Sequence, residues 1–111
     1  MTTVHLPLRL ESVANLREHW TKRAKRAKAH RMAALAIPAH PLPCVVWIVR
    51  IAPRALDDDN LRSAAKALRD GIADRLGVKD NDPRVEWRYA QTRSGPKHYA
   101  CVVEIKPRGD E

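Results

Sequence analysis

The chain has 111 residues and a formal net charge of +8 at pH 7, from 21 Lys and Arg against 13 Asp and Glu. This length predicts one domain spanning 1–111 with a small core, and no apolar run approaches the roughly 20 residues that a membrane-spanning helix needs. The excess of positive charge favours a polyanionic partner, and such a partner is most often a nucleic acid.

The first half of the chain predicts a strand followed by a strongly basic helix. Residues 3–10 alternate loosely between apolar and polar side chains, as a strand with one buried face does. A helix is predicted from Thr21, its N-cap, to about Ile37, where the prolines of 38–43 end it. Its basic residues lie nearly all round the helix, so they form either a solvated face or, in the interpretation we favour, an element that contacts DNA phosphates. With one basic residue from the preceding segment, they are Arg17, Lys22, Arg23, Lys25, Arg26, Lys28 and Arg31.

The second half predicts three strands and the most regular helix. Residues 44–51 are β-branched and nearly all apolar, which predicts a central strand covered on both faces. A helix is predicted over 59–76 and is ended by Gly77, and the alternating segments 84–91 and 98–106 predict a closing hairpin. The order β-α-β-α-β-β predicts an α+β fold, a small mixed sheet with two main helices packed on it.

The sequence "DDDN", Asp57 to Asn60, places three carboxylates side by side in a basic chain. A helix cap, a solvated loop or a cation site would each make this crowding tolerable. If the chain is extended there, Asp57 and Asp59 project to the same side and offer the paired hard oxygen ligands that suit Mg²⁺ or Mn²⁺. Asp80 and Asp82 follow the far end of the helix, so the loop must fold back, or come from a partner subunit, to join them.

The helix that follows carries its polar residues on one side. At about 100° per residue, Asp59, Ser63, Lys66 and Asp70 fall within an arc of roughly 60°. Carboxylates that hold Mg²⁺, a nearby lysine and a basic surface together fit metal-dependent hydrolysis of a phosphodiester. The competing interpretation is a nucleic-acid-binding module whose acidic cluster only caps the helix.

The remaining candidates predict no further chemistry. Cys44 and Cys101 lie in or beside Val-rich runs, which predicts buried core thiols and, weakly, a reducing cytoplasm. The start of the chain lacks the pattern of a secretory signal. The histidines are scattered and are predicted to be exposed or to face DNA; they are His5, His19, His30, His40 and His98.

The segment 56–89 resembles the core of the RusA-type crossover junction endodeoxyribonucleases, which are common in bacteria and their phages and prophages. The family pattern is Asp-x-Asp-Asn-Leu, a helix with a lysine and an aspartate four residues later, and a loop aspartate before a strand. The matching residues here are Asp57, Asp59, Asn60, Leu61, Lys66, Asp70 and Asp82, with Asn15 in the N-terminal turn. The resemblance covers most of the chain, but only its middle third is specific.

The resemblance implies a homodimer that binds four-way (Holliday) junctions and nicks two opposing strands with Mg²⁺, for which Mn²⁺ substitutes. It implies Asp57, Asp59 and Asp82 as metal ligands and Lys66 as the charge-stabilising lysine. Asp80 stays an alternative to Asp82, and Asp58 is dispensable. The family lysine often stands where Ser63 is found, one helical turn before Lys66. Two alternatives to junction resolution stay open, a non-catalytic junction-binding module and a nuclease for other branched DNA.

Overall fold

The computed structural model describes residues 1–12 and 19–109, and it has the predicted α+β fold. Its elements follow the expected order β-α-β-α-β-β, with one short 3₁₀ turn, η2, after the first helix. They are β1 (Thr2–Leu6), α1 (Trp20–Ala33), η2 (Ala34–Ala36), β2 (Cys44–Ala52), α2 (Asp58–Leu76), β3 (Val85–Arg93) and β4 (Ala100–Pro107). The predicted helix over 59–76 is therefore confirmed to within one residue.

The four strands form one mixed sheet in the order β1-β4-β2-β3. β2 pairs with β3 in parallel and with β4 in antiparallel orientation, so it separates the last two strands. The predicted closing hairpin is therefore wrong. The apolar β2 takes a central position, and the connection over 94–99 is long enough to pass from β3 across the end of β2 to β4.

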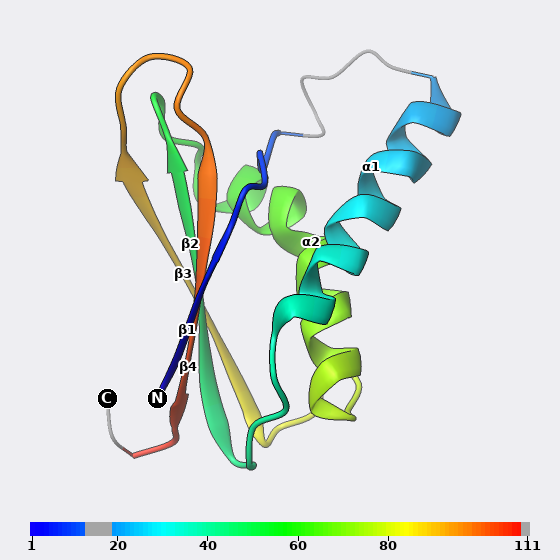
Figure 1. Ribbon diagram of the computed structural model, residues 1–111, viewed down its shortest axis with the longest axis vertical. Helices are drawn as coiled ribbons and strands as arrows, with labels where there is room; N and C mark the ends of the chain where they lie inside the picture. The colour runs from blue at the N-terminus through cyan, green and yellow to red at the C-terminus, as the bar shows by residue number, and fades with distance from the viewer. Residues whose placement is uncertain (13–18, 110–111) are drawn as a thin grey trace.

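Both helices lie on one side of this sheet (Figure 1). Along β2 the residues on that side, such as Val46 and Ile48, are buried, whereas on the opposite side only Val45 is buried and the three residues that follow, Trp47, Val49 and Ile51, are half-buried. The prediction that this strand is covered on both faces is therefore wrong. The apolar run reflects its central position in the sheet rather than a second layer of helices.

The apolar face of α2 packs on the sheet as the spacing predicts. Its buried side chains include Leu61, Ala65, Leu68, Ile72 and Leu76, and they join the strand residues in one core. The helix ends at Gly77, whose φ of 74° is the left-handed conformation that glycine adopts without strain. Burial of this face fixes the orientation of α2, so its polar side chains point away from the sheet.

α1 packs on α2 and itself makes little contact with the hydrophobic core. Its N-cap is His19, whose ring accepts from the Thr21 backbone N–H at 3.3 Å, so the prediction that Thr21 caps the helix is wrong by two residues. His30 is the buried residue of α1, with 7% of its surface exposed, so the expectation of an exposed histidine is wrong there. Burial lowers the pKa of His30, and it faces α2 as part of the contact between the helices.

The two cysteines are buried in the core, as predicted, and both are free thiols. Burial raises the pKa of Cys101 to about 12, which keeps this thiol protonated. Among the described residues, no helix combines the length and the apolar character that crossing a membrane requires.

The contact between the helices is closest at Gly71, which predicts a large effect of a small substitution. A Cβ there would lie 2.6 Å from the Arg31 carbonyl oxygen and 2.8 Å from the Ala34 Cβ. Gly71→Ala should therefore lower the free energy of unfolding by about 1–3 kcal/mol, although alanine is the better helix former. Urea unfolding of Gly95→Ala is the matched control, because a Cβ at Gly95 meets nothing within 4 Å. Equal stability of the two variants would contradict the close approach.

Candidate functional site

The acidic cluster lies at the start of α2, where the helix itself stabilises it. Asp57 is the N-cap, and its Oδ1 accepts from the Asn60 backbone N–H at 2.9 Å. Asp58 and Asp59 form the first turn, where the helix dipole favours negative charge. The chain is extended at Asp57 but helical from Asp58 on, so the condition for Asp57 and Asp59 to project to one side is not met.

A buried arginine holds the segment that leads into this cluster. Arg50, with 6% of its surface exposed, donates to the carbonyl oxygens of Leu10 at 2.8 Å and Arg54 at 2.6 Å. Its guanidinium also donates to the Gln91 side chain at 3.3 Å, and Gln91 bonds both backbone groups of Leu56. Sequence reasoning missed this support. The available signal was a single charge in an apolar strand, because a charge buried there needs several partners.

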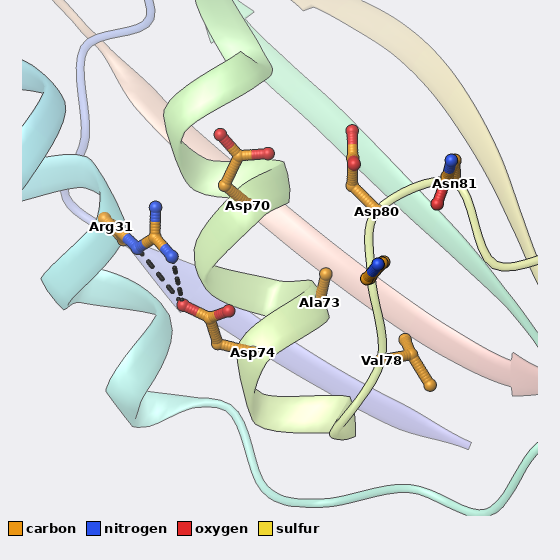
Figure 2. A pocket seen from close by; sticks show the side chains of 8 residues that line it. Arg31, Asp70, Ala73, Asp74, Val78, Asp80 and Asn81 are labelled. Carbon is orange, nitrogen blue, oxygen red and sulfur yellow. Dashed lines mark hydrogen bonds and ion pairs between the residues drawn. The ribbon is translucent and has the colours of Figure 1, made fainter.

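The loop after α2 folds back along the helix and brings Asp80 beside it (Figure 2). The Asp80 carbonyl oxygen accepts from the Arg69 guanidinium at 2.8 Å and from the Trp87 indole at 3.0 Å. Arg69 also donates to the Tyr89 hydroxyl at 3.0 Å. Two side chains from different elements thus fix the backbone at Asp80, and neither was among the predicted site residues.

Lys66 lies between two carboxylates that converge on its ammonium group. Its Nζ is 2.7 Å from Asp70 Oδ1 and 2.7 Å from Asp80 Oδ2. Its hydrogen bonds to Asp70 and then to Asp80 raise the pKa of Lys66, and the bond from Lys66 lowers the pKa of Asp80. The lysine side chain stays 56% exposed, so this cluster is a surface feature open to a ligand.

The Asp82 side chain does not join the cluster around Lys66. Its carboxylate binds the Arg84 guanidinium through both oxygens, at 3.1 and 2.9 Å, and also accepts from the Arg84 backbone N–H at 2.9 Å. These bonds lower the pKa of Asp82 to about 2. The aspartate that the folded-back loop places beside α2 is therefore Asp80, whereas the family pattern points to Asp82.

The predicted site residues are thus divided between two places on α2, and Asp82 lies apart from both, bound to Arg84. The middle of α2 brings together Lys66, Asp70 and Asp80, and the start of α2 carries Asp57, Asp59 and Asn60. Within residues 1–12 and 19–109, no three His, Cys, Asp or Glu side chains form a group that could hold a metal ion. The donor chemistry suits Mg²⁺, but the predicted ligands Asp57, Asp59 and Asp82 do not come together within the described part of the chain.

The polar stripe of α2 consists of Asp59, Ser63, Lys66 and Asp70, and the last three of these face the basic helix across a groove. The groove has a volume of about 260 Å³, and Arg23 and Arg26 of α1 line it together with Ser63, Lys66 and Asp70. A neighbouring pocket of about 390 Å³ continues from Asp70 to the loop residue Asp80 (Figure 2).

The predicted DNA-binding residues of α1 are exposed, except for the half-buried Arg26. Arg31 is bound to Asp74 of α2, with its Nη2 at 2.6 Å from the carboxylate, so it also fixes α1 on α2 (Figure 2). Asn15 and Arg17, predicted with this group, lie outside the described residues. A dense positive surface thus borders the groove that contains Lys66 and Asp70.

Comparison with known proteins gives a limited result. No family model matches the chain. The chain is similar to an uncharacterized protein of Xylella fastidiosa (strain Temecula1 / ATCC 700964), with 38% identity over 79 residues that cover 60% of this chain and 51% of that protein. The chain therefore spans about half the length of the curated relative it matches.

We expect the two loop aspartates, Asp80 and Asp82, to titrate independently of each other, because each has a different basic partner. Lys66→Ala should raise the pKa of Asp80 toward its ordinary value and leave Asp82 unchanged, whereas Arg84→Ala should raise the pKa of Asp82 from about 2 and leave Asp80 unchanged. Each variant is the control for the other, and NMR titration of the carboxyl carbons measures both. Because folding lowers these pKa values, the stability they contribute is present above their ordinary value of 3.8 and is lost as the pH falls toward 2. A shift of both aspartates in either variant would contradict the separation.

Proposed function

We propose that the chain is a Mg²⁺-dependent endonuclease of the RusA type that resolves four-way DNA junctions by paired symmetrical nicks. The observation that carries the proposal is the groove in which Arg23 and Arg26 of a strongly basic helix face Lys66 and Asp70. Positive charge on one wall binds the phosphate backbone, and the Lys66 ammonium group and the Asp70 carboxylate on the other are of the kinds that phosphodiester hydrolysis uses. The setting is DNA recombination and repair in the cytoplasm of a bacterial or phage-infected cell.

The residues take the following parts in this proposal. Asp57, Asp59 and a loop aspartate, Asp82 or Asp80, would hold a Mg²⁺ ion, and the bound ion would supply the Lewis-acid chemistry of phosphodiester hydrolysis. The exposed Lys66 ammonium stabilises negative charge on the transition state. A homodimer places two such sites on one junction, in accord with the two-fold symmetry of paired cuts.

One observation favours a second function, a basic junction-binding module that does not cut. The helix start by itself stabilises Asp57, Asp58 and Asp59, and Lys66 and Arg69 pair with Asp70 and Asp80, so all these acids have a structural role without a metal ion. A nuclease for flaps or other branched DNA is a further variant, which rates of cleavage of a junction, a fork and a linear duplex distinguish.

The first test compares two neighbouring aspartates. With Mg²⁺ the unmodified protein should nick a synthetic four-way junction. Asp59→Asn should abolish nicking and preserve junction binding, because it removes a proposed metal ligand without removing a phosphate contact. Asp58→Asn is the matched control and should retain cleavage, since Asp58 has no part in the proposed site.

Each result of this comparison distinguishes the candidates. Tight junction binding without cleavage by the unmodified protein favours the binding module and refutes the enzyme. Cleavage that survives Asp59→Asn removes Asp59 from the metal site. Gel-based nicking and fluorescence anisotropy on the same DNA give both readouts, and Mn²⁺ in place of Mg²⁺ should support cleavage.

The second test concerns the basic wall of the groove. Arg23→Ala should weaken junction binding and reduce the slope of log K against log salt concentration by about 1, because one phosphate contact is lost. Lys106→Ala is the matched control, because it removes the same charge from the opposite face of the sheet. It should leave the slope unchanged. Anisotropy titrations at several salt concentrations measure the slope. Equal effects of the two variants would mean that only the net charge attracts DNA.

A further inference from the structure

Trp20, in the first turn of α1, is the aromatic residue that the fold leaves most open to solvent. It is 70% exposed, whereas the other four Trp and Tyr residues are half-buried. Those four are Trp47, Trp87, Tyr89 and Tyr99, and the chain has no phenylalanine. Tryptophan combines a large apolar ring with a polar N–H, which is why it is enriched at surfaces that meet a partner.

The protein's own cations lie on the other four rings. An arginine lies over each of them, with its guanidinium carbon 4.0 to 5.6 Å from the ring centre. Trp20 instead has the His19 ring beside it, with the two ring centres 5.6 Å apart and the ring planes tilted by 35°. The His19 ring is in turn held by the bond that it accepts from the Thr21 backbone N–H. Trp20 thus presents open ring surface on an ordered helix start.

Trp20 lies at the open end of the groove between the two helices. α1 and α2 run in the same direction, because the end of α1 packs at Gly71 while Arg23, near its start, shares the groove with Ser63. Two helical turns separate Trp20 from Ala27, another residue that lines the groove, so both lie on the same side of α1. The helices diverge toward their starts (Figure 1). Trp20 therefore lies beyond the narrow part of the groove, toward the end at which α2 begins.

The charge around Trp20 favours nucleic acid over other partners. Lys22, Arg23 and Lys25 follow it closely and are all exposed. A second copy of α1 would bring the same positive charge and be repelled. A membrane surface would need an apolar stripe, but Trp20 and Met32, the exposed large apolar residues of α1, lie about 120° apart around the helix. Aromatic surface among basic residues is instead the combination that binds the bases and phosphates of an unpaired strand.

A branch in DNA offers bases that such a ring can reach. In a continuous duplex each base is stacked between two neighbours, whereas a base at the point where duplexes part lacks a neighbour on one side. An aromatic side chain can take the place of the missing neighbour, and every base has a face for it. Arg23 and Lys66 line the groove behind Trp20, where they can bind phosphates of the same strand.

We propose that Trp20 stacks on an unstacked base of branched DNA, while Arg23 binds the phosphate backbone of the same strand at the mouth of the groove. This contact favours branched over continuous DNA, because a continuous duplex has no free base face along its length. The inference rests on the proposed function for the identity of the DNA. Stacking on Trp20 itself needs no metal ion and no cleavage.

The test measures how much of the binding depends on bases. In EDTA, the affinity for an oligothymidylate of about ten nucleotides is divided by the affinity for an abasic oligomer of the same length, which has the same phosphates. Trp20→Leu should lower this ratio about tenfold, and Trp20→Phe, which keeps an aromatic ring, should retain most of it. Trp47→Leu is the matched control and should leave the ratio unchanged, because Trp47 lies on the face of the sheet opposite the helices.

A second measurement covers the case in which the control Trp47→Leu does not fold. The oligothymidylate should quench the tryptophan fluorescence of the unmodified protein, and the abasic oligomer should not. Trp20→Phe should lose most of this quenching, since Trp47 and Trp87 are then the remaining tryptophans. Equal quenching of the two proteins, a ratio near one in the unmodified protein, or an unchanged ratio in Trp20→Leu overturns the inference.

The outcomes separate this inference from its rivals and from the proposed nuclease. If Trp20→Leu leaves the base ratio unchanged but abolishes self-association in sedimentation, or binding to anionic vesicles, the ring contacts a second copy or a membrane and the inference is overturned. Junction cleavage with a base ratio near one refutes the stacking contact alone. Base-dependent binding in EDTA by a protein that cleaves no junction in Mg²⁺ refutes the nuclease alone.

Discussion

The close approach of the two helices at Gly71 is the constraint on which the surface depends. With no side chain at this position, α2 approaches the Arg31 backbone and the Ala34 side chain of the first helical segment. α1 has a single buried residue, His30, so it has almost no core of its own to hold it in place. The ion pair of Arg31 with Asp74 adds to this contact. These contacts hold the positively charged helix α1 next to the polar stripe of α2. Without them, repulsion among the cations of α1 would oppose its packing there.

Two buried or half-buried arginines fix the segments at either end of α2. Arg50 holds the approach to Asp57 through carbonyl oxygens and Gln91, and Arg69 holds the returning loop through the Asp80 carbonyl oxygen. Both donate to backbone carbonyl oxygens, and Arg69 also lies 3.8 Å from the Asp80 carboxylate. The chain that carries the acidic side chains is thereby held by hydrogen bonds to charged donors, which are stronger than those between neutral groups.

The parts of the structure that the sequence predicts well depend on neighbours along the chain. The apolar spacing of α2, the glycine that ends it and the burial of Cys44 and Cys101 all follow from local patterns. The position of β2 between β3 and β4 does not, because alternation along a strand says which side chains are buried but not which strand lies beside it. The candidate site divides in the same way. The polar stripe is a property of one helix, whereas the choice of Asp80 over Asp82 depends on Arg69 and Trp87, which bind the same carbonyl oxygen from two elements.

The arrangement of charge explains how a strongly basic protein tolerates its acids and what that implies for DNA. Asp82 is bound to Arg84, and Lys66 lies between Asp70 and Asp80, so the carboxylates closest to the groove present little net negative charge to an approaching phosphate backbone. The three aspartates at the start of α2 are instead exposed, and among the described residues it is the helix N-terminus that stabilises them. This is the part of the surface that attracts a cation most strongly and repels a phosphate without a bound cation most strongly. If the proposed nuclease function holds, a divalent ion at this end of α2 is what lets the DNA backbone approach it.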